Sequence, residues 1–140
     1  MNFSIKVQYG IQAALELAKK FNAGPVQIGD IARSQMIPVR YLEQLLLILK
    51  RRHLLSSLRG KEGGYNLAKH PSDISVLEVI EALDGPINLT NKRLKKYPVL
   101  FELFENLQNN IKDSLKETTL EDLIFRVSKK ERAYIYNYNI

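Results

Sequence analysis

A mainly α-helical fold with one small β-hairpin is the fold class that the sequence predicts. Three stretches, residues 4–21, 38–52 and 97–115, repeat apolar residues at helical spacing. A fourth stretch, residues 54–67 (LLSSLRGKEGGYNL), alternates apolar and polar residues on both sides of a turn that holds three glycines. With 140 residues and no cysteine, the chain is long enough to bury one core without disulfide bonds.

The first half of the chain has the element order of a winged helix-turn-helix. A first helix over Ser4 to Phe21, with Ser4 as its N-cap, is followed by the helix-breaking sequence Asn22-Ala-Gly-Pro25. A short second helix is expected around Ile28 to Ala32, and Pro38 is expected to begin a third, amphipathic helix with a basic end. Because the hairpin comes next, we expect it to be the wing of this motif.

Capping signals predict two further helices. A fourth helix is expected over Ser75 to Leu83, where Ser75 and Glu78 form a capping box, and a polar, basic connector follows over residues 86–96. Thr119 and Asp122 are expected to cap a last, short helix. The tyrosine-rich end, YIYNYNI, is expected to be docked or frayed.

The longest helical pattern runs from Tyr97 to Leu115. Apolar residues recur four, three, four and four positions apart, which is close to the spacing of a coiled-coil seam. Such a helix carries a continuous apolar stripe, so we expect it to pack against a large surface. The stripe consists of Leu100, Phe101, Phe104, Leu107, Ile111 and Leu115.

Positive charge is concentrated around the predicted hairpin. The net charge of the chain is +6, and the segment Lys50 to Lys61 contains five cations and no acid. Such a field suits a polyanion such as nucleic acid, although a merely solvated basic face is the alternative. No stretch is apolar enough to span a membrane and the N-terminus lacks a signal-peptide pattern, so we expect a cytoplasmic location.

The third helix and the hairpin turn carry the candidate DNA-contacting residues. Arg40 and Gln44 lie on one face, flanked by Tyr41 and Glu43, near the helix end that reaches base edges in helix-turn-helix proteins. Arginine suits guanine and glutamine suits adenine, but both residues could also form only the solvated side of the helix. Arg59-Gly60-Lys61 lies where a winged helix needs a second contact, which favours DNA binding, and Gly60 permits close approach to a duplex.

Several short motifs recur together at characteristic separations. They are Val7-Gln8-Tyr9-Gly10, Gly24-Pro25-Val26, Ile31-Ala32, Ile37-Pro38, Tyr41-Leu42-Glu43-Gln44-Leu45-Leu46, Arg59-Gly60 and Gly63-Gly64-Tyr65. In these motifs the sequence resembles the Rrf-two family of bacterial winged-helix transcription regulators, of the IscR, NsrR and CymR type. The resemblance covers nearly the whole chain, and the pair YLEQLL and RG..GGY is its most specific part.

This resemblance implies roles for the matching segments. The helix that begins at Pro38 would read the major groove, the wing Arg59 would enter the minor groove, and the helix from Tyr97 to Lys116 would cross its partner's to form a homodimer. The domain organisation would then be a winged helix-turn-helix over residues 1–84, a connector over 85–96 and, over 97–140, the dimerisation helix, the short last helix and the tail. The resemblance nominates Tyr41, Glu43, Gln44 and Arg59 for DNA contact, and charge and placement add Arg40, Arg51 and Lys61.

Many members of this family hold an iron–sulphur cluster through three cysteines in the connector, which here corresponds to Gly85 to Tyr97. That segment has no cysteine. Gln8 and Gln12, the positions in the first helix that would face the cluster, are neutral amides with poor affinity for iron. We therefore expect neither a cluster nor another metal site. His53 and His70 have no second ligand at metal-binding spacing and are expected to be surface residues.

The sequence as a whole predicts a homodimeric, sequence-specific DNA-binding regulator of transcription, a repressor that binds a pseudo-palindromic operator. A winged-helix protein-interaction module and an RNA-binding protein are the alternatives. The motifs of serine hydrolases, nucleotide-binding enzymes and zinc proteases do not occur, so an enzyme is not expected. The expected partners are double-stranded DNA and a second copy of the chain, and a protein or small-molecule effector stays open.

Overall fold

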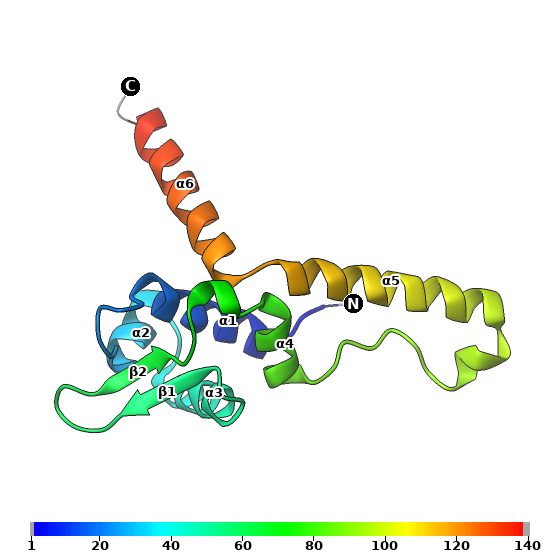
Figure 1. The fold of residues 1–140 in the computed structure, drawn as a ribbon, viewed down its shortest axis with the longest axis horizontal. Coiled ribbons are helices and arrows are strands. Elements are labelled where there is room, and N and C mark those ends of the chain that lie inside the picture. Colours follow the sequence, from blue (N-terminus) through cyan, green and yellow to red (C-terminus); the bar gives the residue numbers. More distant parts are fainter. Residues whose placement is uncertain (1, 139–140) are drawn as a thin grey trace.

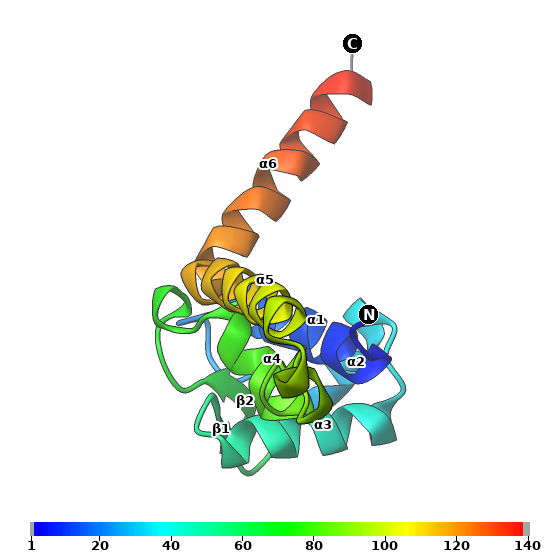
Figure 2. The same cartoon turned by 90° about the vertical axis from the view of Figure 1, so that its right-hand side faces the viewer.

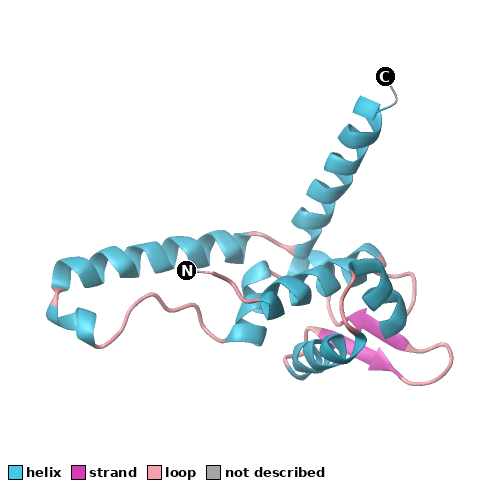
Figure 3. Cartoon of the chain, turned by 180° about the vertical axis from the view of Figure 1, so that it is seen from behind, coloured by secondary structure: helices cyan, strands magenta, loops and turns pink. Residues whose placement is uncertain are grey.

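The computed structural model describes residues 2–138 of the chain as six α-helices, two short 3-10 helices and one two-stranded antiparallel hairpin (Figures 1 and 3). This arrangement confirms the prediction of a mainly helical winged helix-turn-helix with a small hairpin wing and a long helix in its C-terminal half. The elements are α1 (Ile5–Lys19), α2 (Ile28–Gln35), α3 (Val39–Arg51), β1 (Leu55–Leu58), β2 (Gly64–Leu67), a 3-10 turn (Pro71–Asp73), α4 (Val76–Asp84), a second 3-10 turn (Arg93–Lys96), α5 (Pro98–Glu117) and α6 (Leu120–Tyr138).

The predicted capping residues begin three of the helices. Ser4 Oγ accepts a hydrogen bond from the Val7 amide at the start of α1. Ser75 and Glu78 form the capping box of α4, with reciprocal hydrogen bonds of 3.1 and 2.9 Å between side chain and backbone. Thr119 and Asp122 form the same reciprocal pair at the start of α6, with distances of 3.1 and 2.9 Å.

The start of α3 differs by one residue from the prediction. Pro38 occupies the N-cap position with an extended backbone, φ −57° and ψ 129°, and the helix begins at Val39. The Pro38 carbonyl accepts the first helical hydrogen bond, from the Leu42 amide at 2.9 Å. Proline therefore still sets the entry into the helix, because its restricted φ suits the residue that precedes the first turn.

One hydrophobic core joins the first four helices, the base of the hairpin and the start of α6. α1 and α4 pack so closely at Gly10 that a Cβ atom there would lie 2.1 Å from the Leu83 side chain. Leu120, the first residue of α6, is fully buried in this core, so the core extends beyond residues 1–84. Its most deeply buried large side chains are Leu17, Ile31, Leu42, Leu45, Leu46, Leu49, Ile74 and Leu120.

The base of the hairpin is attached to the loop before α2. Leu55 pairs with Leu67 and Leu58 with Gly64, so both core-facing leucines lie at the same end of the ladder. Val26 and Tyr65 then exchange two backbone hydrogen bonds, of 2.9 and 2.8 Å, which form an isolated antiparallel bridge between the hairpin and this loop. Gly64 allows this approach, since a Cβ atom there would lie 2.4 Å from the Val26 carbonyl oxygen.

The two C-terminal helices leave the body in different directions (Figures 1 and 2). No residue of α5 is buried, and the connector runs back along it, held by a 2.8 Å hydrogen bond from the Leu89 amide to the Gln108 side chain. The segment between α5 and α6 is tied to the start of α4, because Val76 donates to the Thr118 carbonyl and Leu120 to the Ile74 carbonyl. In the part of the chain that is described, no helix is long and apolar enough to cross a membrane.

The expectation of a short last helix followed by a docked or frayed tail is wrong as far as Tyr138, because one helix of 19 residues, Leu120–Tyr138, takes the place of both. α6 continues as a helix through Tyr134 and Tyr136, whose side chains are largely exposed. The physical reason is that residues 120–138 contain neither glycine nor proline and begin with a complete capping pair, so nothing local ends the helix. Asn139 and Ile140, the last two residues of the predicted tail, lie outside the described residues.

Candidate nucleic-acid interface

The outer face of α3 lies beside the hairpin, on the side of the molecule opposite α6 (Figures 1 and 2). The core side of α3 is formed by Leu42, Leu45, Leu46 and Leu49, each at most 1% exposed. The other side carries the exposed polar and charged residues, in the helical spacing of a single face. These include the predicted residues Arg40, Glu43, Gln44 and Arg51, together with Lys50.

Tyr41 has a different environment from its neighbours on α3. It is half-buried, and its ring packs edge-to-face on that of Tyr9 in α1, with centroids 5.8 Å apart and an interplanar angle of 72°. Such a pair stabilises the packing of the two helices. The structure thus brings Arg40, Glu43 and Gln44 together on the solvent side and directs Tyr41 toward the first helix.

A buried carboxylate holds the turn between α2 and α3. Glu16 is only 6% exposed and accepts hydrogen bonds from Gln35, at the end of α2, at 2.9 Å and from Lys20 at 3.0 Å. Burial alone would raise the pKa of Glu16, but the hydrogen bonds from Lys20 and Gln35 and the Lys20 charge outweigh it and lower the pKa below its ordinary value. The carboxylate is therefore ionised at neutral pH and positions the end of α2.

The wing tip exposes its cations and is held by the second helix. Arg59 and Lys61 are exposed, and neither forms an ion pair with any residue from 2 to 138. The Gln27 side chain, at the N-cap position of α2, donates a 3.0 Å hydrogen bond to the Lys61 carbonyl. Gly60, with φ +109°, and a 3.0 Å hydrogen bond from the Gly63 amide to the Gly60 carbonyl form the turn.

Lys50 connects α3 to the wing. Its ammonium group donates a 2.6 Å hydrogen bond to Ser57 Oγ on β1. His53 follows the end of α3 with a left-handed backbone, φ +61°, and its amide donates to the Lys50 carbonyl. The basic cluster predicted over Lys50 to Lys61 is thus divided between the end of α3 and the turn of the wing, with Lys50 between them.

Three contacts of this interface were not found by sequence reasoning. They are the hydrogen bond from Gln27 to the wing, the link from Glu16 to Gln35, and the link from Lys50 to Ser57. The first two join residues 34 and 19 positions apart. Only the third contact is indicated by the sequence, because Lys50 and Ser57 lie close together in the chain, in the basic segment and the hairpin that it overlaps.

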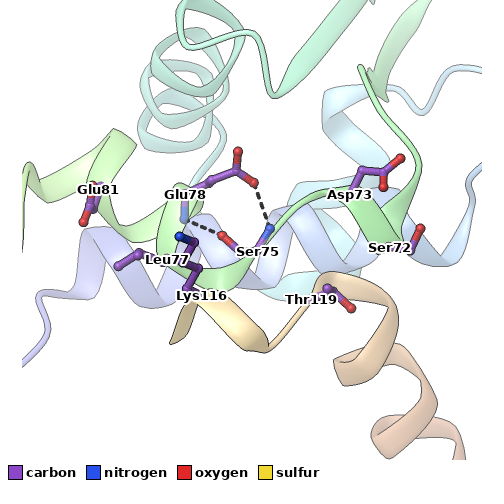
Figure 4. Close-up of a pocket in the computed structure, with 8 residues that line it drawn as sticks. All are labelled: Ser72, Asp73, Ser75, Leu77, Glu78, Glu81, Lys116 and Thr119. Atoms are coloured by element: carbon purple, nitrogen blue, oxygen red, sulfur yellow. Dashed lines mark hydrogen bonds between the residues drawn. The ribbon is translucent and has the colours of Figure 1, made fainter. Parts of the chain in front are cut away.

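A separate hollow lies on the other side of α4, between the turn at Pro71–Asp73 and the junction of α5 and α6 (Figure 4). It has a volume of about 440 Å³, and its charged side chains are Asp73, Glu78, Glu81 and Lys116. Glu78 is already engaged in the α4 capping box, drawn as dashed lines in Figure 4. Because acidic side chains outnumber basic ones there, the hollow repels a polyanion such as DNA. It therefore does not extend the basic interface.

The connector lines another hollow, of about 260 Å³, with Phe3, Ile80 and Ile111. Its one carboxylate is Asp84, which accepts hydrogen bonds of 3.0 and 3.2 Å from Ser4 Oγ. The amides of Gln8 and Gln12 are directed elsewhere, to the carbonyls of Phe3 and Gln35. Because the chain contains no cysteine, these residues do not supply the thiolates that an iron–sulphur cluster needs.

Comparison with known proteins gives consistent matches over most of the chain. The model of the Rrf2 family, described as iron-dependent transcriptional regulators, matches residues 3–126. The chain is 35% identical over 136 residues to the HTH-type transcriptional regulator CymR of Bacillus subtilis strain 168, which covers 97% of this chain and 99% of that protein. It is also 35% identical over 130 residues to the HTH-type transcriptional regulator IscR of Escherichia coli O1:K1 / APEC, which covers 89% of this chain and 80% of that protein.

The fold matches as well as the sequence. The solved structure of CymR (YrzC), described as the global cysteine regulator of B. subtilis, aligns with a TM-score of 0.84 at 36% identity and covers 90% of this chain and 98% of that one. Together, the winged helix-turn-helix, its basic face and these matches establish the class of protein. The chain belongs to the Rrf2 family, and it is a DNA-binding regulator of transcription and not an enzyme.

Proposed function

We propose that the chain acts as a homodimer that binds a pseudo-palindromic operator and represses transcription by occupying it. The observation that carries this proposal is the position of the exposed face of α3 beside the cationic wing, on one side of the molecule (Figure 1). In this arrangement α3 enters the major groove while the wing reaches an adjacent groove or the backbone, as in other helix-turn-helix proteins.

Each exposed side chain has a suitable partner on DNA. In this proposal Arg40 donates to guanine, Gln44 pairs with adenine, and Glu43 accepts from the cytosine amino group. Arg59 enters the minor groove, where a narrow groove concentrates negative potential. Arg51 and Lys61, and Lys50 beside them, neutralise phosphates.

The apolar surface of α5 supports a dimer. Val99, Leu100, Leu103 and Leu107 are between 43% and 80% exposed in the single chain, although they form one stripe. Leu115 instead packs against the protomer's own core, and Ile111 is half-buried beside the connector. We therefore assign dimer contact to the predicted residues Leu100, Phe101, Phe104 and Leu107, together with the exposed Val99 and Leu103 beside them.

A two-fold axis through α5 gives the expected form of the operator. Two copies of α3 related by this axis contact half-sites about one helical turn, or about 34 Å, apart. Each copy reads the same half-site on opposite strands, so the operator is a pseudo-palindrome. Two linked weak contacts then bind much more tightly than either one alone.

We also propose that this member of an iron-dependent family works without an iron–sulphur cluster. The support is the donor set, because the chain has no cysteine and the hollow beside the connector offers Asp84 as its only carboxylate. Anaerobic purification followed by visible absorption spectroscopy tests this point. We expect no charge-transfer band, and a strong band that co-purifies with the protein would contradict it.

Fluorescence anisotropy tests the main proposal. The probes are a duplex selected from bound genomic fragments, a scrambled duplex of equal composition and a structured RNA, each titrated at several salt concentrations. We expect tight binding to the selected duplex only, with a log–log salt dependence of about 0.9 per contacted phosphate. Addition of the protein to a transcription reaction from that promoter should reduce transcript. Equal binding to both duplexes, or increased transcript, would overturn the proposal.

A further inference from the structure

Two apolar side chains are exposed at the start of the recognition helix. Met36, in the turn before α3, is 86% exposed, and Val39, the first residue of α3, is 46% exposed. Between them Ile37 is buried, with only 4% exposure. The core beneath this region is already filled by the leucines of α3, so packing within the chain does not require either exposed side chain.

Local structure does not explain these residues either. Met36 has a left-handed backbone, with φ 56° and ψ 47°, where glycine or asparagine is normally favoured. Val39 is β-branched and lies in a helical first turn, where polar residues that complement the helix N-terminus are preferred. Single exposed apolar residues are common, but these two lie three positions apart, and Val39 directly precedes Arg40.

The chemistry of the major groove gives these side chains a partner. Along the base edges in this groove the apolar group is the C5-methyl of thymine, and small aliphatic side chains contact it. Helix-turn-helix proteins contact bases with the N-terminal residues of the second helix, and Val39 is the first of them. The methyl groups of Val39 lie one helical turn before Glu43, on the exposed side of α3.

We propose that Val39 packs against the C5-methyl of a thymine in each operator half-site, and that Met36 covers the same methyl from the preceding turn. This inference rests on the proposed entry of α3 into the major groove and adds an apolar component to its sequence reading. The contact selects thymine over cytosine at that position by shape and hydrophobicity, whereas Arg40 and Gln44 select their bases by hydrogen bonding.

Replacement of thymine by deoxyuridine tests the contact directly, because it removes the methyl group and leaves base pairing unchanged. Each thymine of the selected operator is replaced in turn, in both half-sites, and the dissociation constant is measured by fluorescence anisotropy. At the contacted position we expect binding to weaken about fourfold per half-site, which corresponds to about 0.8 kcal/mol for a buried methylene-sized group. Other thymines should change binding much less.

The variant Val39→Ala provides the second arm of the experiment. We expect this variant to bind the thymine operator about as weakly as the unmodified protein binds the deoxyuridine operator. It should no longer discriminate between thymine and deoxyuridine at that position. Ile5→Ala is the matched control, because Ile5 is an aliphatic side chain with 52% exposure at the start of α1, outside α3 and the wing. This control should keep full discrimination. Thermal melting of both variants verifies that they are folded.

The outcomes separate this inference from the proposed function. If no deoxyuridine substitution weakens binding while Gln44→Ala still does, α3 lies in the major groove and the apolar contact is wrong. If Gln44→Ala also leaves operator binding unchanged, the proposed placement of α3 is wrong, and this inference falls with it. Retention of full thymine discrimination by Val39→Ala would assign the methyl contact to another residue and overturn the inference.

Discussion

Arg59 is the side chain at the wing tip with the clearest expected effect on DNA binding. It is exposed and forms no ion pair within residues 2–138, so truncation removes a free cation without disturbing the core. If the guanidinium reads a base or a narrow minor groove, Arg59→Ala should weaken operator binding by about 1–3 kcal/mol and reduce the preference for the operator. Anisotropy with operator and scrambled duplexes measures both quantities. Lys61→Ala is the matched control. We expect it to weaken binding less than Arg59→Ala does, and by the same factor on the operator and on the scrambled duplex. If Arg59→Ala also weakened binding to both duplexes by the same factor, Arg59 would be a phosphate contact.

Glu16 is the residue on which the turn between α2 and α3 depends. Its pKa in the folded protein lies below the ordinary value of 4.5, so the folded state binds fewer protons than the unfolded state in that range. The stability that Glu16 contributes is therefore complete above about pH 4.5 and is lost as the pH falls through the lowered pKa. We expect Glu16→Gln to reduce the free energy of unfolding by about 1–3 kcal/mol at pH 7, because a charged hydrogen-bond partner of Lys20 is lost.

Urea unfolding at pH 7 and at pH 3 checks this prediction. The difference between Glu16→Gln and the unmodified protein should shrink as the pH falls through the lowered pKa, because a growing fraction of the native carboxylate is then protonated. Glu117→Gln is the control, since Glu117 is an exposed carboxylate at the end of α5, and it should change stability little at either pH. If Glu16→Gln left the free energy of unfolding at pH 7 unchanged, the charge of Glu16 would not stabilise the fold.

The wing depends on one close backbone contact at its base. At Gly64, φ is +146° and a Cβ atom would lie 2.4 Å from the Val26 carbonyl oxygen, so Gly64→Ala should break the pairing of Val26 with Tyr65. We expect a loss of about 1–3 kcal/mol in stability and faster hydrogen exchange at the Val26 and Tyr65 amides. Gly24→Ala is the matched control, because its φ is +96° but nothing lies near the added atom. Unchanged exchange at both amides in Gly64→Ala would contradict this account.

Elements with a local signal were predictable, and contacts between distant segments were not. The capping pairs at Ser75 and Thr119 and the hairpin turn involve neighbouring residues, so the sequence carries their full pattern. The predicted last helix is too short, because the tyrosines at positions 134, 136 and 138 alternate and so mark no helical face, although neither glycine nor proline interrupts the helix. Helical spacing also predicts that Arg40 and Gln44 share one face of α3, and both are exposed there. The packing of Tyr41 on Tyr9 depends on how α1 and α3 cross, which spacing along one helix does not reveal.

The whole molecule combines one compact core with two helices that extend from it, and this shape bears on how the protein would bind an operator. A single copy presents one α3 and one wing, whereas an operator of two half-sites needs a second copy at a set distance. The exposed apolar residues of α5 from Val99 to Leu107 are available for that contact. In the proposed dimer they would link the two basic faces.

Loss of the dimer is therefore the decisive prediction at this scale. We expect the double substitution Leu103→Gln and Leu107→Gln to give a monomer in light scattering at micromolar concentration, since both leucines are 43% or more exposed and lie on one stripe. The fold should persist, because neither side chain contributes to the core. Operator affinity should fall by about 100-fold or more, as the two half-sites are then bound independently.

Asn109→Gln, on the opposite side of α5, changes neither charge nor the stripe and should remain dimeric with full affinity. A double variant that stays dimeric, or a monomer that binds the operator as tightly as the unmodified protein, would show that α5 does not set the spacing of the two DNA-binding faces.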